Sequence, residues 1–297
     1  MCDETTEAEN RVWLAAHSLG RRDIGKFGAA AAAAALMPGA ALAAGSQGAT
    51  KAGAKGRLVS IKTPDGTADA WFVHPDEGKH PAVILWPDIA GLRDAYKVMA
   101  ERLAASGYAV LVVNQYYRSA RAPVLNSLSD WFAKEGQAKL KPMIAAITPE
   151  GTTKDGAAFV GWLDAQPEVD TKRKIGSTGY CMGGPFTLRT AAARPDRVGA
   201  IGSFHGAGLV TDKSDSPHLL IPKIKAALLI CIAQNDDASD LKAKTVLRDA
   251  AEAAKRPAEI EVYAAQHGWC TIDAPVYDKA QADKAWARTL ETFRKYL

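Results

Sequence analysis

Short apolar runs alternate with amphipathic segments along most of this chain. Apolar runs bounded by polar or glycine-containing stretches are typical of strands buried on both faces of a parallel sheet. They lie at residues 81–86, 108–113, 174–178, 198–204, 226–233 and 259–264. Helical patterns separate nearly all of them, at residues 93–106, 154–164, 185–193, 239–255 and 279–296. This alternation predicts a doubly wound α/β sheet built from right-handed crossovers.

Two further strands are predicted at the start of the sheet. Residues 57–62 and 69–74 flank the turn Thr63-Pro64-Asp65-Gly66, which predicts an antiparallel hairpin. The expected sheet then has about eight strands in a single domain, since the roughly 250 residues left after a leader suffice for one core. In the last helix Trp286, Leu290, Phe293 and Leu297 share one face, which predicts a docking stripe.

The turn between the strand at 174–178 and the helix from 185 has the sequence Gly-Tyr-Cys-Met-Gly-Gly. A nucleophile elbow is a sharp strand-to-helix turn with a strained central residue, so the residues two before and two after it must be small. Gly179 and Gly183 meet this need, and Cys181 would project alone above the sheet. The start of the helix favours a thiolate and an oxyanion there. The alternative is a small buried cysteine in a tight crossover.

An acid and a histidine follow in the order that a hydrolase triad of this kind requires. The apolar run 226–233 ends at Gln234-Asn235-Asp236-Asp237, and we predict Asp236 as the acid. The next run is followed by His267, which we predict as the base. As alternatives, Asp236 could be a capping carboxylate and His267 a surface histidine, while Asp237 or Asp240 could cap the next helix.

These motifs, with Trp86-Pro87-Asp88-Ile89-Ala90-Gly91-Leu92, resemble the dienelactone hydrolase family of cysteine-nucleophile α/β-hydrolases. The resemblance runs from about residue 57 to 297. It implies an α/β-hydrolase fold with Cys181 as nucleophile, His267 as base and Asp236 as the acid that orients it. It also implies an oxyanion hole formed by the backbone N–H groups of Met182 and Ile89.

The chain departs from the family pattern at two places. Known members have a glutamate where this chain has Asp88, and that glutamate interacts with the resting thiol. We expect Asp88 to tune the protonation of Cys181, so that Asp88→Ala changes the pH dependence more than the folding. The arginines that hold the lactone carboxylate have no clear counterpart, since Thr271 stands four residues after His267.

Side chains for a substrate pocket are expected from a long connection and from two strand ends. The connection 116–153 is longer than most between strand and helix, and such insertions are usually functional. It contributes Tyr116 and Arg118, and His205 and Trp269 follow other strands. The alternatives are a peripheral helix pair for the insertion and a hydrogen bond from His205 to a loop carbonyl.

The N-terminal segment resembles a twin-arginine signal, with Arg21-Arg22-Asp23-Ile24-Gly25-Lys26 before a weakly apolar run, 27–44, that ends in small residues. We therefore predict a signal peptide at 1–44, a flexible tail at 45–56 and a hydrolase domain at 57–297. The export machinery would place the protein in the periplasm or outside the cell. A non-functional leader would leave it in the cytoplasm, and a membrane anchor is disfavoured because the run is only modestly apolar.

Charge and motif content argue against several classes of ligand. The formal net charge of +4 is spread along the chain, without the basic blocks of nucleic-acid-binding proteins. Nucleotide-binding glycine motifs and metal-ligand spacings are not found, so we expect no cofactor and no metal. The sequence does not determine the oligomeric state, and a monomer is the default expectation. A disulfide between Cys270 and Cys181 is left open.

The sequence thus predicts a cysteine hydrolase that cleaves an ester or lactone bond of a small, anionic substrate through an acyl-enzyme. Two alternatives remain. One is an esterase or thioesterase of the same fold that acts on another acyl group. The other is a binding or thiol-redox protein without turnover.

Overall fold

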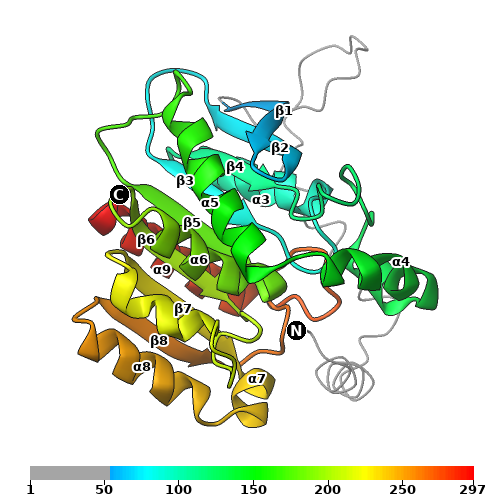
Figure 1. The fold of residues 1–297 in the computed structure, drawn as a ribbon, viewed down its shortest axis with the longest axis vertical. Helices are drawn as coiled ribbons and strands as arrows, with labels where there is room; N and C mark the ends of the chain where they lie inside the picture. Colours follow the sequence, from blue (N-terminus) through cyan, green and yellow to red (C-terminus); the bar gives the residue numbers. More distant parts are fainter. Residues whose placement is uncertain (1–53) are drawn as a thin grey trace, which may run out of the picture.

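The computed structural model describes residues 54–297, which form one eight-stranded sheet with helices on both faces (Figure 1). The strands are β1 (Ala54–Thr63), β2 (Gly66–Pro75), β3 (Ala82–Trp86), β4 (Ala109–Val113), β5 (Ile175–Tyr180), β6 (Val198–Phe204), β7 (Ala227–Ala233) and β8 (Ala258–Tyr263). Their order across the sheet is β1-β2-β4-β3-β5-β6-β7-β8.

The predicted hairpin and parallel sheet are both confirmed. Strand β1 pairs antiparallel with β2, and β2 pairs antiparallel with β4. All other neighbours are parallel, from β4 through to β8. Parallel strands end at the same edge of a sheet, so the loops after β3, β5, β6, β7 and β8 meet there.

Helices cover the two faces in separate sets. The α-helices are α3 (Asp94–Ala104), α4 (Lys134–Ala145), α5 (Pro149–Asp164), α6 (Gly184–Ala193), α7 (Gln234–Ser239), α8 (Ala243–Ala253) and α9 (Lys279–Tyr296). Helices α5, α6 and α8 pack on one face, and α3 and α9 pack on the other. Strand β3 serves both cores because its side chains alternate, with Ile84 facing the first set and Leu85 the second.

The expected docking stripe on α9 is confirmed. Phe293 and Leu297 are buried, and both lie against Gly176 of β5. Trp286 and Leu290 are partly buried in the same core.

Three boundaries differ from the sequence expectations. Strand β1 begins at Ala54, inside the segment expected to be a flexible tail, and the predicted signal peptide lies outside the described residues. Helix α5 begins at Pro149 rather than at residue 154, because Thr148 Oγ1 accepts a hydrogen bond from the N–H of Gly151 at 2.9 Å and caps it. The helix predicted at 239–255 begins later, as α8 at Ala243. A separate short helix, α7, follows β7 directly and ends where Asp240 leaves helical geometry.

The long insertion contains regular structure. It folds into the 3₁₀ helix η2 (Leu128–Phe132) and helix α4 before α5 begins. The capping box formed by Ser127 and Asp130 starts η2. Across residues 54–297, the helices are too short or too polar to span a bilayer.

Candidate active site

Cys181 lies in a sharp turn between β5 and α6. Its φ is +51°, in the left-handed region that L-residues other than glycine rarely adopt, and its side chain is buried. A Cβ on Gly179 would lie 2.1 Å from the carbonyl oxygen of Gly183, and one on Gly183 would lie 2.4 Å from that of Trp86. Both positions therefore require glycine, and the turn has the geometry of a nucleophile elbow.

His267, on the loop after β8, and Asp236, in the first turn of helix α7 directly after β7, form a close pair. Nδ1 of His267 lies 2.8 Å and 2.9 Å from the two carboxylate oxygens of Asp236. The backbone N–H of His267 donates to Oδ1 of Asn235 at 2.8 Å, so the residue before the acid also holds the histidine loop. Sequence reasoning did not single out Asn235, and its only signal was its place beside Asp236.

The neighbouring acids have other partners. Asp237 forms an ion pair with Lys244 at 2.7 Å. Oδ1 of Asp240 accepts from the backbone N–H groups of Lys242 and Ala243 at 3.2 Å, which makes it a capping residue before α8. Of these three acids, Asp236 is the one that lies against His267.

His205 packs directly on His267. Their ring centroids lie 4.8 Å apart in an edge-to-face arrangement, and His205 is 1% exposed with a φ of +40°. Neither ring nitrogen of His205 has a hydrogen-bond partner within the described chain, so the expected bond to a loop carbonyl is absent. Burial and the neighbouring His267 hold the pKa of His205 well below its usual value, which makes it a neutral imidazole.

Trp269 lies behind the two histidines. It is fully buried, stacks on Tyr263 with ring centroids 5.2 Å apart and contacts His205 at 5.1 Å. It is therefore a core residue that supports the site rather than a surface of a substrate pocket.

Asp88 is clamped by an arginine. Nη1 and Nη2 of Arg93 donate to its two carboxylate oxygens at 2.7 Å and 3.0 Å, and the N–H of Ala90 donates to Oδ1 at 2.9 Å. The other side of Arg93 binds Asp273 on the loop after His267, at 2.7 Å and 2.8 Å. Burial alone would lower the pKa of Arg93, but the two carboxylates outweigh it and raise the pKa.

This clamp joins three segments and was not predicted. Oδ2 of Asp273 also accepts from the N–H of Leu128, so η2 of the insertion is tied to the histidine loop. The carboxylate of Asp88 thus binds Arg93 and the backbone of its own loop. Its predicted effect on the protonation of Cys181 is not tested by these contacts and stays a prediction. Arg93 stands five residues after Asp88, and its pairing across 180 residues to Asp273 left no sequence signal.

Tyr116 holds the loop that follows β3. Its hydroxyl donates to the carbonyl oxygen of Ile89 at 2.7 Å and lies 3.9 Å from Sδ of Met182. The side chain of Gln115 donates to the carbonyl oxygen of Asp88 at 2.7 Å. Tyr116 therefore bridges the two residues whose N–H groups the resemblance assigns to an oxyanion hole.

Arg118 pairs with two acids outside the residues described so far. Its guanidinium binds Asp155 of α5 and Asp65 in the β1–β2 turn, each at 2.7 Å, and stacks over Tyr117. Two carboxylates thus engage Arg118, and its place in a substrate pocket stays a prediction. Cys270 is a buried free thiol, so the disulfide with Cys181 that the sequence left open is not formed.

Comparison with known proteins identifies a family that matches most of the chain. The profile of the dienelactone hydrolase family matches residues 68–297. A carboxymethylenebutenolidase of Rhodococcus opacus is 27% identical over 242 residues, which cover 80% of this chain and 90% of that protein. An Escherichia coli (strain K12) protein predicted to be a carboxymethylenebutenolidase is 26% identical over 246 residues, 80% of this chain and 86% of its own.

Solved structures share the fold. The crystal structure of a predicted dienelactone hydrolase from Klebsiella pneumoniae superposes with a TM-score of 0.69 at 22% identity, over 82% of this chain and 99% of that one. With the family match over most of the chain, the relatives indicate a hydrolase of ester or lactone bonds. The chain therefore belongs to the dienelactone hydrolase family.

Proposed function

We propose that this protein cleaves small esters or lactones with Cys181 as nucleophile, His267 as general base and Asp236 as the acid that orients the imidazole. The observation that carries the proposal is the strained cysteine at the end of β5 together with the pair formed by His267, after β8, and Asp236, in the first turn of α7 after β7. These segments meet at the edge of the sheet where parallel α/β folds bind ligands.

The reaction has two halves. His267 takes the proton of the Cys181 thiol, and the thiolate attacks the carbonyl carbon of the substrate. The N–H groups of Met182 and Ile89 stabilise the oxyanion, and the leaving oxygen departs with the proton from His267. Water then gives a proton to His267 and attacks the thioester, which releases the carboxylic acid and restores the thiol.

Asp236 has an electrostatic role in this scheme. Its carboxylate accepts the Nδ1–H of His267, so Nε2 is left to exchange the proton. It also stabilises the imidazolium that forms when the thiol is deprotonated. For Asp88 we propose a structural role. Its carboxylate is bound by Arg93 and by the N–H of Ala90, and these bonds hold the loop that carries Ile89.

The names of the relatives and the contacts of two arginines support a proposal for the substrate class. A matched protein of Bradyrhizobium carries a lactonase name, as the Rhodococcus relative carries a butenolidase name. Arg93 and Arg118 are each engaged by two carboxylates, so neither has the freedom to hold a substrate carboxylate. We therefore favour a small lactone or enol ester whose recognition depends on its ring more than on a charge.

Intact-mass spectrometry tests the nucleophile. The reduced full chain is mixed briefly with p-nitrophenyl acetate or a simple enol lactone while product release is followed. We expect a transient acyl adduct that maps to Cys181, is absent in Cys181→Ala and persists in Cys270→Ala. Adduct and turnover in Cys181→Ala would contradict the assignment.

A panel of esters, thioesters and lactones separates the alternatives. Preference for thioesters or long acyl esters would favour the esterase or thioesterase alternative. A reduced protein that forms no adduct with any of them would favour a binding or thiol-redox role.

We also propose export by the twin-arginine route to the periplasm or the medium, on the sequence of residues 21–44. Cell fractionation of the full chain and of an Arg21→Lys, Arg22→Lys variant tests it. Export of the parent and retention of the variant are expected. Equal cytoplasmic retention of both would favour a cytoplasmic enzyme.

A further inference from the structure

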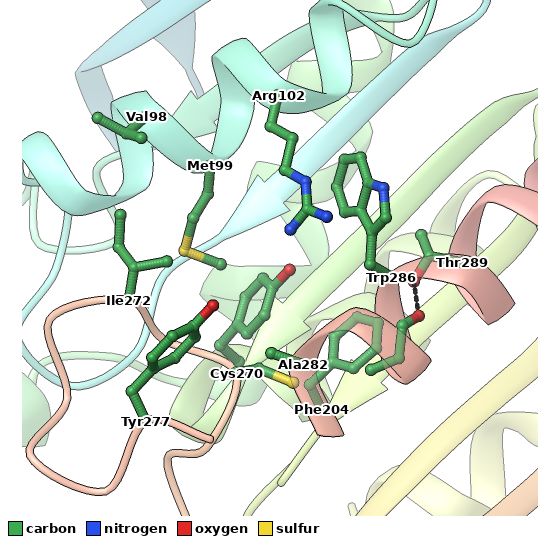
Figure 2. A pocket seen from close by; sticks show the side chains of 12 residues that line it. Val98, Met99, Arg102, Phe204, Cys270, Ile272, Tyr277, Ala282, Trp286 and Thr289 are labelled. Carbon is green, nitrogen blue, oxygen red and sulfur yellow. Dashed lines mark hydrogen bonds between the residues drawn. The ribbon is translucent and has the colours of Figure 1, made fainter. Parts of the chain in front are cut away.

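A cavity of about 90 Å³ lies on the sheet face covered by α3 and α9 (Figure 2). Side chains from α3, α9, two strand ends and the loop after β8 line it: Val98, Met99, Arg102, Tyr180, Phe204, Cys270, Ile272, Tyr277, Ala282, Ala285, Trp286 and Thr289. Cys181, Asp236 and His267 are not among them. The cavity is therefore separate from the site described above.

The walls and rim of the cavity are apolar. Met99, Ala282 and Trp286 face its interior, as Figure 2 shows. Val98 and Ile272 stand at the rim with 53% and 39% of their surface exposed. Large apolar side chains gathered in the open around a cavity are a feature of ligand-binding sites.

Three hydrogen-bond donors complete the lining. The hydroxyls of Tyr180 and Tyr277 have no hydrogen-bond partner in the part of the chain that the structure describes, and burial raises the pKa of both tyrosines, so each keeps its proton. The guanidinium of Arg102 lies 4.2 Å over the ring of Trp286. One of its nitrogens donates to Asp283 at 3.2 Å, which leaves further N–H groups to a ligand.

We propose that this cavity binds a small apolar monocarboxylate. Its carboxylate would accept from Arg102 and the tyrosine hydroxyls, and its apolar body would pack between Met99, Ile272 and Trp286. A carboxylate fits better than a cation, because the polar groups that line the cavity are mainly donors. Asp283, the acid nearest Arg102, is itself paired with Arg102 and Lys279.

The floor of the cavity belongs to the strands that carry the active site. Tyr180 and Phe204 stack with ring centroids 5.0 Å apart, and they directly precede Cys181 and His205. Cys270 and Ile272 belong to the loop after β8, which also carries His267. An occupant would therefore contact side chains next to the elbow without touching the triad, and its binding does not depend on the proposed function.

Fluorine NMR titration of the reduced full chain tests the proposal with 4-fluorobenzoate and its neutral counterpart, 4-fluorobenzyl alcohol. We expect the acid to bind with a dissociation constant on the order of 1 mM and the alcohol at least about fivefold more weakly. Arg102→Met should weaken the acid by about fivefold and leave the alcohol unchanged.

A matched pair of variants locates the binding. Ala285→Leu fills the cavity and should abolish binding of the acid, whereas Ala287→Leu adds the same side chain on an exposed position of α9 and should not affect it. Binding that survives Ala285→Leu lies elsewhere, the active site included, and would overturn the proposal. Equal affinity for acid and alcohol would also overturn it.

Discussion

The imidazole of His205 meets the imidazole of His267 edge to face, with 4.8 Å between ring centroids. His267 faces a carboxylate at its Nδ1, whereas both nitrogens of His205 are buried without a partner among the described residues. Two residues of the same type, in contact, are thus held in opposite electrostatic environments. The ring of His267 is oriented by a carboxylate for proton transfer, and the ring of His205 excludes water behind it.

His205 should make the stability of the protein fall in acid. Its pKa is lowered in the folded state, so the unfolded chain binds a proton below pH 6.5 that the folded protein refuses. This effect is absent above pH 6.5. Below that pH, the free energy of unfolding falls by about 1.4 kcal/mol per pH unit until the pH reaches the folded-state pKa of His205.

The measurement is chemical denaturation between pH 5 and 8 of wild type and His205→Asn, since asparagine tolerates the positive φ. Below about pH 6.5, we expect the free energy of unfolding to fall more steeply with decreasing pH in wild type than in His205→Asn. His80→Asn, at a histidine that is not fully buried, serves as the control. Identical slopes for wild type and His205→Asn would show that His205 is not held neutral.

Gly183→Ala should destroy the elbow. The new Cβ would lie 2.4 Å from the carbonyl oxygen of Trp86 and 2.6 Å from that of Pro87, and backbone cannot move as a flexible side chain can. We expect a loss of about 2–4 kcal/mol in the free energy of unfolding and at least about 100-fold in kcat/KM. Esterase assays and denaturant melts check both.

Gly161→Ala is the matched control. Its nearest neighbouring atom, Nη1 of Arg194, lies 3.9 Å from the new Cβ, and the residue is in helix α5. Alanine there should leave activity unchanged and stabilise the helix by about 0.5–1 kcal/mol. Equal behaviour of the two variants would contradict the elbow geometry.

Asp236→Asn should lower kcat by about 10³–10⁴-fold, because an amide that accepts from His267 no longer stabilises the imidazolium. Asp237→Asn changes the adjacent residue, whose partner is Lys244, and should change kcat by less than about threefold. Steady-state kinetics of the two variants under reducing conditions make the comparison. A larger loss of kcat in Asp237→Asn than in Asp236→Asn would identify Asp237 as the acid of the triad.

Asp88→Asn should mainly affect stability. It removes one of the two carboxylates that pair with Arg93, which is 1% exposed. A buried charge left without any partner costs about 3–5 kcal/mol, and a smaller loss is expected here because Asp273 remains paired with Arg93. We expect a clear fall in the unfolding midpoint and an unchanged shape of the pH–rate profile. The exposed pair of Asp94 and Lys97 supplies the control, since Asp94→Asn should change stability by less than about 1 kcal/mol.

The opposite outcome is also informative. A shifted pH–rate profile with unchanged stability in Asp88→Asn would support the thiol-tuning role that the sequence suggested. It would count against an assignment of Asp88 to the loop alone.

The strands and the elbow could be predicted from sequence because local sterics and periodicity encode them. Runs such as 226–233 are apolar because both faces of their strand are covered, and Gly179 and Gly183 are small because backbone atoms lie where a Cβ would be. Each requirement acts within a few residues. The order of Cys181, Asp236 and His267 could be inferred because each follows a recognisable strand.

Other features were decided only by the tertiary structure. Asp236 and Asp237 are the same residue type at adjacent positions, and only the path of the chain after β7 turns the first toward His267. The clamp of Asp88, Arg93 and Asp273 joins residues that no local pattern links, and the same is true of His205 against His267. The partners of Arg118 could not be predicted either, because its sequence position does not show which carboxylates the fold brings near. The pattern of apolar residues along the chain predicts which positions are buried. The partners of charged and polar side chains depend on distances that exist only after the sheet has formed.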